Sequence, residues 1–156
     1  TNQKHSIYMN LKSLLRLELI KIIKENFRGR CLLIGSELKE IYPDAINSKF
    51  EKNFLKKYYK GNLCVDFLAK DGEEALYPRS IEIIESGGIL VQIKTKESKN
   101  LYEHFESEIT FNNKKEMIEN LTNLINTKDL SRINQFFIRK FDNEKLNFKT
   151  LNRFFV

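Results

Sequence analysis

The residues best suited to chemistry gather in one stretch of the chain, residues 71–93. Tyr77-Pro78 begins a predicted helix whose first N–H groups are free to meet an anion, and Arg79 adds a planar cation suited to phosphate oxygens. Glu74 and Glu82 are separated by seven residues, which places one carboxylate on a loop and the other in the helix's first turn. Such a pair can hold neighbouring hydroxyl groups of a sugar or ribose. The alternative for Glu82 is a first-turn glutamate that the helix dipole stabilises.

Glycines mark two further positions. Gly35 and Ser36 follow the apolar run of residues 31–34, and a glycine there lets a ligand approach the backbone closely. The chain has neither the GxxxxGK[ST] loop nor the GxGxxG fingerprint, which excludes the common phosphate-loop and dinucleotide motifs. Gly87 and Gly88 indicate a tight turn between a helix and the strand that follows it.

Apolar runs alternate with helical patterns along most of the chain. The predicted strands are residues 31–35, 62–68, 88–93 and 108–111, and the predicted helices are residues 9–27, 48–59 and 78–86 with a further helix from Asn113. This alternation predicts an α/β fold, a Rossmann-like doubly wound parallel sheet with helices on both faces. In such a sheet, ligands bind beyond the carboxyl ends of the strands.

A length of 156 residues fits one domain. We expect residues 1–128 to form the Rossmann-like unit and residues 129–156 to form a helical tail packed on it. The tail interleaves six phenylalanines with Arg and Lys: Phe136, Phe137, Phe141, Phe148, Phe154 and Phe155. Stacking on nucleic acid is one interpretation of that pattern. Cover for the sheet is the interpretation we favour, since aromatic stripes at helical spacing usually belong to a core.

The net charge of +6 is unevenly distributed, because residues 1–60 carry +7 and residues 61–128 carry −4. The acidic middle argues against nucleic acid as a partner. Cys31 and Cys64 lie in apolar runs without CxxC spacing, so we expect reduced thiols of a cytoplasmic protein and no metal site. No apolar run is long enough to span a bilayer, and no signal-peptide core is visible near the start.

The helix-turn-strand phrase IEIIESGGILVQ resembles the donor-binding domain of GT-B glycosyltransferases. It is similar to the E-A-x-A-x-G-x-P-V-[IL] segment of the group 1 enzymes, and more so to the R-x-x-E-x-x-x-x-G-x-x-[LV]-[LV] form of the CgeB-like branch. The later phrase FESEITFNNKKEMIENLTNLI resembles the family's closing strand and helix. The likeness spans about residues 10–126.

The resemblance implies roles for individual residues. Glu82 matches the glutamate that binds the ribose hydroxyls, and Glu74 matches the one that holds the donor sugar. Gly87 or Gly88 matches the glycine after the helix. The R-x-x-x-x-K pair that neutralises the pyrophosphate in the group 1 enzymes has no counterpart here, and Arg79, with Ser80 and Tyr77 beside it, is the candidate substitute. The segment Ala75-Leu76-Tyr77-Pro78 keeps the family's proline but lacks its glycine.

The function implied is transfer of a sugar from a nucleoside diphosphate sugar, with UDP- or GDP-sugar as donor and no metal or other cofactor. A GT-B active site lies between two domains, so the resemblance also implies an N-terminal acceptor domain in the same or another chain. The alternative is a non-catalytic interaction module that docks a partner, or a membrane surface, through the basic face of residues 49–60.

Overall fold

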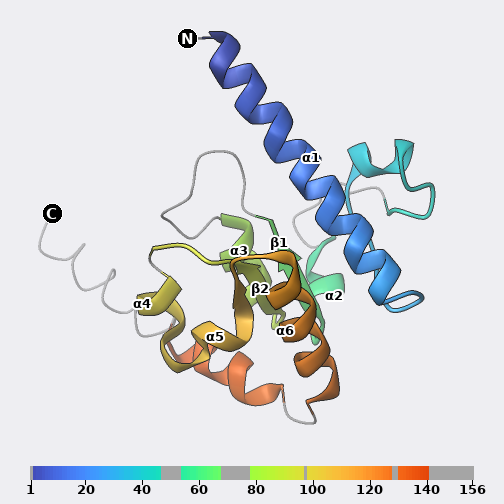
Figure 1. The fold of residues 1–156 in the computed structure, drawn as a ribbon. Coiled ribbons are helices and arrows are strands. Elements are labelled where there is room, and N and C mark those ends of the chain that lie inside the picture. Colours follow the sequence, from blue (N-terminus) through green and yellow to red (C-terminus); the bar gives the residue numbers. More distant parts are fainter. Residues whose placement is uncertain (1, 47–53, 68–77, 97, 128–129, 141–156) are drawn as a thin grey trace, which may run out of the picture.

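The computed structural model describes residues 2–46, 54–67, 78–96, 98–127 and 130–140. Its elements are shown in Figure 1. They are α1 (Asn2–Asn26), η1 (Ser36–Glu40), α2 (Lys56–Tyr59), β1 (Leu63–Asp66), α3 (Pro78–Glu85), β2 (Ile89–Ile93), α4 (Ser98–Tyr102), η2 (Glu103–Phe105), α5 (Glu106–Ile109), β3 (Thr110–Phe111) and α6 (Lys114–Asn126). Residues 131–140 form a further helix.

The described strands make one parallel sheet in the order β1-β2-β3. Four consecutive residues of β2, from Ile89 to Gln92, are buried. Because successive side chains of a strand point to opposite faces, both faces of β2 must be covered. The fold is therefore mixed α/β with a small parallel sheet. The strand order does not reverse among the described strands.

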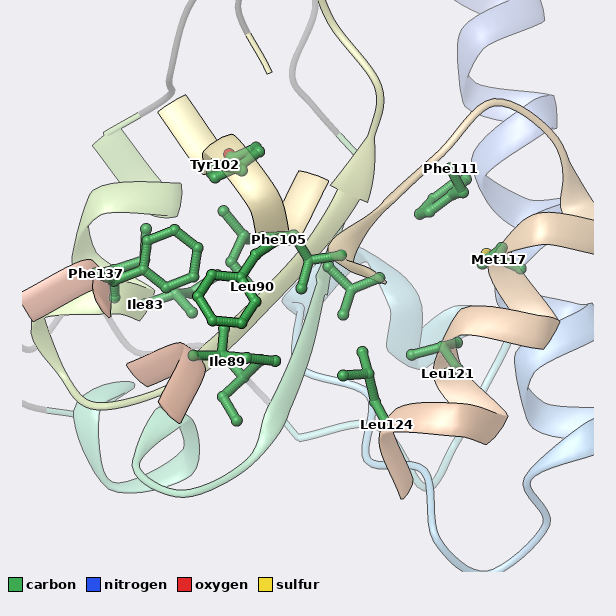
Figure 2. Close-up of a cluster of buried hydrophobic side chains, with 14 of the residues drawn as sticks. Ile83, Ile89, Leu90, Tyr102, Phe105, Phe111, Met117, Leu121, Leu124 and Phe137 are labelled. Atoms are coloured by element: carbon green, nitrogen blue, oxygen red, sulfur yellow. The ribbon is translucent and has the colours of Figure 1, made fainter. Parts of the chain in front are cut away.

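The core divides into two layers around β2 (Figure 2). Ile83 of α3, Phe105 of η2 and Phe137 lie on one side, so the connections between the strands and the helix of residues 131–140 cover the same face. Met117, Leu121 and Leu124 of α6 lie on the other side with Phe111. All of these residues belong to one hydrophobic cluster, to which Leu19 and Ile23 of α1 also contribute.

The prediction of a strand at residues 31–35 is wrong. Ile34 forms only an isolated parallel bridge with Ile46, and the run lies outside the three-stranded sheet. Leu32 is 53% exposed, so the run is not buried on both faces as its apolar composition indicated. The last predicted strand is shortened, because Glu108 and Ile109 are helical and only Thr110–Phe111 pair with β2.

The turn between α3 and β2 follows the sequence expectation closely. The Gly88 amide donates to the Ile83 carbonyl at 2.9 Å and the Gly87 amide donates to the Ile84 carbonyl at 3.0 Å, the pair of bonds that closes a Schellman motif. Gly87 has φ +80, which glycine adopts without strain. On α3 the buried side chains are Ser80, Ile83 and Ile84. Ile81, which its helical spacing from Ile84 predicts to face the sheet, is only half-buried.

Helix α1 packs against α6 through its C-terminal half, and its N-terminal half extends beyond the other elements (Figure 1). Leu19, Ile20 and Ile23 are buried, whereas Leu14 and Leu15, expected on the same apolar face, are exposed. No described helix combines the length and the apolar character that crossing a bilayer requires.

Candidate functional site

A row of polar side chains crosses the sheet at the carboxyl ends of β1 and β2 and at the first residue of β3. Asp66 of β1 is paired in register with Gln92 of β2, and Gln92 is paired with Thr110 of β3. Residues paired across a sheet project from the same face. All three side chains are buried, and Gln92 is 1% exposed. We call Asp66, Gln92 and Thr110, together with Ser80 and Tyr102, the polar row.

Helix α3 contributes Ser80 to this row. The Ser80 hydroxyl is fully buried and donates to Oδ2 of Asp66 at 2.8 Å. The bond ties the first turn of α3 to the carboxyl end of β1. Thr110 is satisfied locally, because its hydroxyl donates to the carbonyl of Glu106 at 2.7 Å.

Gln92 and Tyr102 hold polar atoms that form no well-aligned hydrogen bond with any of the described residues. These atoms are Oε1 of Gln92 and the hydroxyl of Tyr102, and both are buried. Burial raises the pKa of Tyr102, the negative charge of Asp66 raises it further, and the nearby Gln92 side chain lowers it. Tyr102 is therefore a neutral phenol with a proton to donate. A buried donor or acceptor without a partner costs about 1–3 kcal/mol, so a ligand that pairs with these atoms would recover that free energy.

The row offers the bonding groups that hydroxylated ligands need. The carboxylate of Asp66 accepts hydrogen bonds, the phenol of Tyr102 donates one, and the amide of Gln92 does both. Divalent metal sites use several ligating side chains, and among the described residues no group of three or more His, Cys, Asp or Glu side chains is placed to hold a metal ion. With hydrogen-bond donors and acceptors side by side, the row suits sugar or ribose hydroxyl groups.

The residues predicted on α3 separate in the structure. Ser80 joins the polar row, Arg79 is exposed in the first turn, and Glu82 is half-buried on another side of the helix. Burial raises the pKa of Tyr59 to about 12, with Glu82 raising it further and Arg79 lowering it. Arg79 and Glu82 thus act electrostatically on the same phenol, and α3 brings Ser80, but not Glu82, onto Asp66.

The other predicted positions do not add side chains to the row. Gly35 precedes η1 and donates its amide to the Ile46 carbonyl at 3.0 Å, and Ser36 is the first residue of η1. Gly87 closes α3 at its far end from Ser80. Glu74 and Tyr77 lie outside the described residues.

Sequence reasoning missed Asp66, Gln92 and Tyr102. A signal was present for the first two, since each is a polar residue inside a run that otherwise predicts a strand buried on both faces. A buried polar side chain needs a partner or a function. Tyr102 carried no such signal, because its position depends on how α4 packs over β2.

Comparisons of the chain with protein-family models, with curated proteins and with solved structures find no match. The functional argument therefore rests on the chain's own residues.

Proposed function

We propose that this chain binds a nucleoside diphosphate sugar at the carboxyl end of its sheet, as the donor-binding domain of a GT-B-type glycosyltransferase. The observation that carries the proposal is the polar row. In it Asp66, Gln92 and Tyr102 present buried hydrogen-bonding groups, and the described residues leave an atom of Gln92 and the hydroxyl of Tyr102 without a well-aligned hydrogen bond. Ligands of parallel α/β sheets bind at this edge. The finer fold that goes with the proposal is a Rossmann-like, doubly wound sheet.

The first turn of α3 supplies a place for the diphosphate. Ser80 is fixed to Asp66, so the helix N-terminus lies near the row, and Arg79 is exposed beside it. Free N–H groups and a guanidinium together stabilise the charge that grows on a diphosphate as the bond to the sugar breaks. Transfer of the sugar then requires an acceptor domain facing this edge, in the same chain or another.

Binding of UDP, GDP and their sugars, followed by isothermal titration calorimetry and by NMR shifts, tests the proposal. We expect millimolar or tighter binding that Asp66→Asn weakens about tenfold, which corresponds to about 1.4 kcal/mol. Arg79→Gln should weaken the binding of the nucleoside diphosphates and leave the affinity for the free sugar unchanged. Glu85→Gln, an exposed change on the same helix, serves as the matched control.

Glu82→Gln tests the role that the resemblance implies for that residue. A loss of nucleotide affinity in this variant with an intact affinity for the free sugar would place the ribose at Glu82 and the sugar at the row. Failure of all the nucleotides to bind at millimolar concentration, in a chain that unfolds cooperatively, would refute the proposed function.

A second candidate is a non-catalytic module that docks an acidic partner through its basic face. The observation that favours it is the exposure of Lys56, Lys57 and Lys60 on and beside α2. Lys57 Nζ lies 4.8 Å from the ring centroid of Tyr58 and 5.0 Å from that of Phe54, which orders the cation at the surface. A Lys56→Glu, Lys57→Glu double variant that keeps nucleotide binding but loses a partner recovered from its native source would support this candidate.

A further inference from the structure

A surface hollow of about 510 Å³ lies between η2 and the helix of residues 131–140. The function proposed above does not use it. Its lining combines aromatic rings with cations: Phe105 and Phe136, His104, and three basic side chains against the single carboxylate of Glu103.

Three rings form the aromatic part of the hollow. The His104 ring centroid lies 4.1 Å from that of Phe105 and 5.3 Å from that of Phe136, and the two phenylalanine rings are 5.1 Å apart. Phe105 is buried, Phe136 is half-buried and His104 is exposed. The buried ring therefore supports an outer pair to which a planar ligand has access.

The cations differ in how firmly they are held. Arg132 pairs with Glu108 and lies over the Phe105 ring at 5.2 Å. Lys140 donates to Glu103 at 2.7 Å and to the Asn100 carbonyl at 2.6 Å. Arg139 is exposed and has no carboxylate partner within the described part of the chain. Arg139 is thus the cation available to an incoming anion.

The backbone beside the rings is strained. Glu103 has φ +50, a left-handed conformation that is uncommon for a residue other than glycine. The ion pair with Lys140 holds this residue, and the lowered pKa of the Glu103 carboxyl, caused first by its hydrogen bond with Lys140, keeps that pair charged near neutral pH. Strain of this kind persists where surrounding contacts enforce it, and it is common at binding sites.

We infer that the hollow binds single-stranded nucleic acid, with a base stacked on the exposed His104 ring beside Phe136 and the adjoining phosphate on Arg139. Aromatic faces next to cations are the arrangement that binds single strands without reading their sequence. The rings here offer a stacking surface that a duplex, whose bases are already stacked, cannot use. A free nucleotide has the same chemistry but only one phosphate-linked base with which to engage the hollow.

Fluorescence anisotropy of the full chain with a labelled single-stranded oligonucleotide of about 12 residues tests the inference. We expect saturable binding that His104→Ala weakens about fivefold or more, the effect of losing one base stack. Arg139→Gln should reduce the affinity and lower the salt slope by about 0.7, the contribution of one phosphate contact on a single strand. Both side chains are exposed, so the variants should fold, which thermal melting checks.

Lys115→Gln on α6 is the matched control, since Lys115 is an exposed cation outside the hollow. It should leave the affinity within about twofold of the parent. The inference is overturned if Lys115→Gln weakens binding as much as Arg139→Gln, or if a duplex of equal length competes equally well. It is also overturned if the mononucleotide competes as well as the oligonucleotide, because the ligand would then be a free nucleotide. The hollow is lined by none of the residues of the polar row, so we expect its variants to leave the nucleotide-sugar titrations unchanged, and the two proposals can fail independently.

Discussion

The Ser80 hydroxyl lies fully buried against Asp66, and its loss is the simplest test of the polar row. Ser80→Ala removes the one side-chain hydrogen bond that the described residues donate to the Asp66 carboxylate, and Asp66 is 8% exposed. A buried charge left with one partner fewer should destabilise the fold by about 1–3 kcal/mol in urea unfolding. Ser86→Ala is the control, since the half-buried Ser86 hydroxyl, just beyond the end of α3, donates to the Glu82 carbonyl and to no carboxylate among the described residues. Equal losses in both variants would show that the Asp66 bond has no special role.

Substitution of two glycines by alanine tests whether packing space or backbone conformation requires glycine at each position. A Cβ at position 88 would lie 2.9 Å from the Ile83 side chain and 3.0 Å from the backbone oxygens of Ile83 and Tyr59. Backbone atoms yield little, so Gly88→Ala should destabilise the fold by about 1–3 kcal/mol. A Cβ at position 29 would meet no atom within 4 Å, but the residue must keep φ +73. We therefore expect Gly29→Ala to destabilise the fold by about 1 kcal/mol. Chemical denaturation measures both, and a greater loss at Gly29 would contradict the packing argument.

The thiol pKa of Cys64 tests how closely β1 is packed. Burial raises the pKa of the Cys64 thiol to about 12 from an ordinary value of 9.0, and it raises that of Cys31 as well. The unfolded thiol therefore loses its proton first as the pH rises, and stability that is complete below about pH 9 declines toward the folded pKa. We expect the parent to lose more stability than Cys64→Ala between about pH 8 and about pH 11. A steeper decline in the variant would be inconsistent with a buried thiol.

The candidate site could be predicted only in part from single residues. Ser80 and Arg79 were correctly assigned to the first turn of a helix that starts at Pro78. The alignment of Asp66 with Gln92 depends on strand register, which is decided by packing across the sheet. The prediction of which α3 side chains face the sheet was also partly wrong. Ile83 and Ile84 are buried as expected, but Ser80 is buried in place of Ile81, and Glu82 lies apart from the polar row.

Helix α6 begins with reciprocal side-chain bonds. Oδ1 of Asn113 accepts from the Glu116 amide at 3.0 Å, while the Glu116 carboxylate accepts from the Asn112 amide at 2.8 Å. Asn113→Ala should lower stability by about 1 kcal/mol in thermal or urea unfolding, because the first turn loses its cap. Asn123→Ala, an exposed change within the same helix, should have a smaller effect.

Glu116 gives the same helix a pH dependence. Its pKa lies below the ordinary 4.5, chiefly because of the Asn112 backbone N–H. The stabilisation is therefore complete above about pH 4.5 and is lost as the pH falls through the lower folded pKa. Unfolding followed from about pH 6 to about pH 3 should show a steeper loss in the parent than in Glu116→Gln. Parallel curves for the two proteins would contradict the proposed capping.

At the level of elements, the sequence predicted structure best where the spacing of apolar residues agreed with the Pro and Gly residues that mark the ends of elements. Residues 63–66 and 89–93 are strands as predicted. Helix α3 begins at Pro78, and the turn that follows it contains Gly87, as the chemistry of these two residues indicated. The run at residues 31–35 is mostly apolar, as β2 is, yet of the two segments β2 alone is packed on both faces. A short apolar run does not itself reveal what will pack on it. Leu14 and Leu15 illustrate the same limit on α1, since their helical spacing is right and no described element covers them.

Across the whole molecule, the chain builds one core from segments distant in sequence. Leu19 of α1, the strands, α6 and the helix of residues 131–140 belong to the same cluster. The two phenylalanines of the tail that lie among the described residues differ in burial. Phe137 is fully buried, as cover for the sheet requires, whereas the half-buried Phe136 lines the hollow; the later phenylalanines lie outside the described residues. Adjacent positions on one helix thus serve the core and the surface.

Phe137 tests whether the chain's last described helix is part of the cooperative unit. Its ring lies 5.6 Å from that of Tyr102 in a perpendicular arrangement, and it packs in the layer with Ile83 and Phe105 (Figure 2). Phe137→Ala should cost about 3–5 kcal/mol, since the cavity would open in the middle of a close-packed cluster. Ile138→Ala, 44% exposed on the same helix, should change stability by less than about 0.5 kcal/mol.

The measurement is urea unfolding followed by far-UV circular dichroism and by tyrosine fluorescence. If the helix and sheet form one unit, both probes of each variant must report the same midpoint, because a shared core unfolds in a single transition. A Phe137→Ala protein whose two midpoints separate, or whose stability matches that of Ile138→Ala, would show that residues 131–140 dock on a sheet that is already stable without them. That outcome would also remove the rigid support that Phe105 and Phe136 need to hold a stacked base.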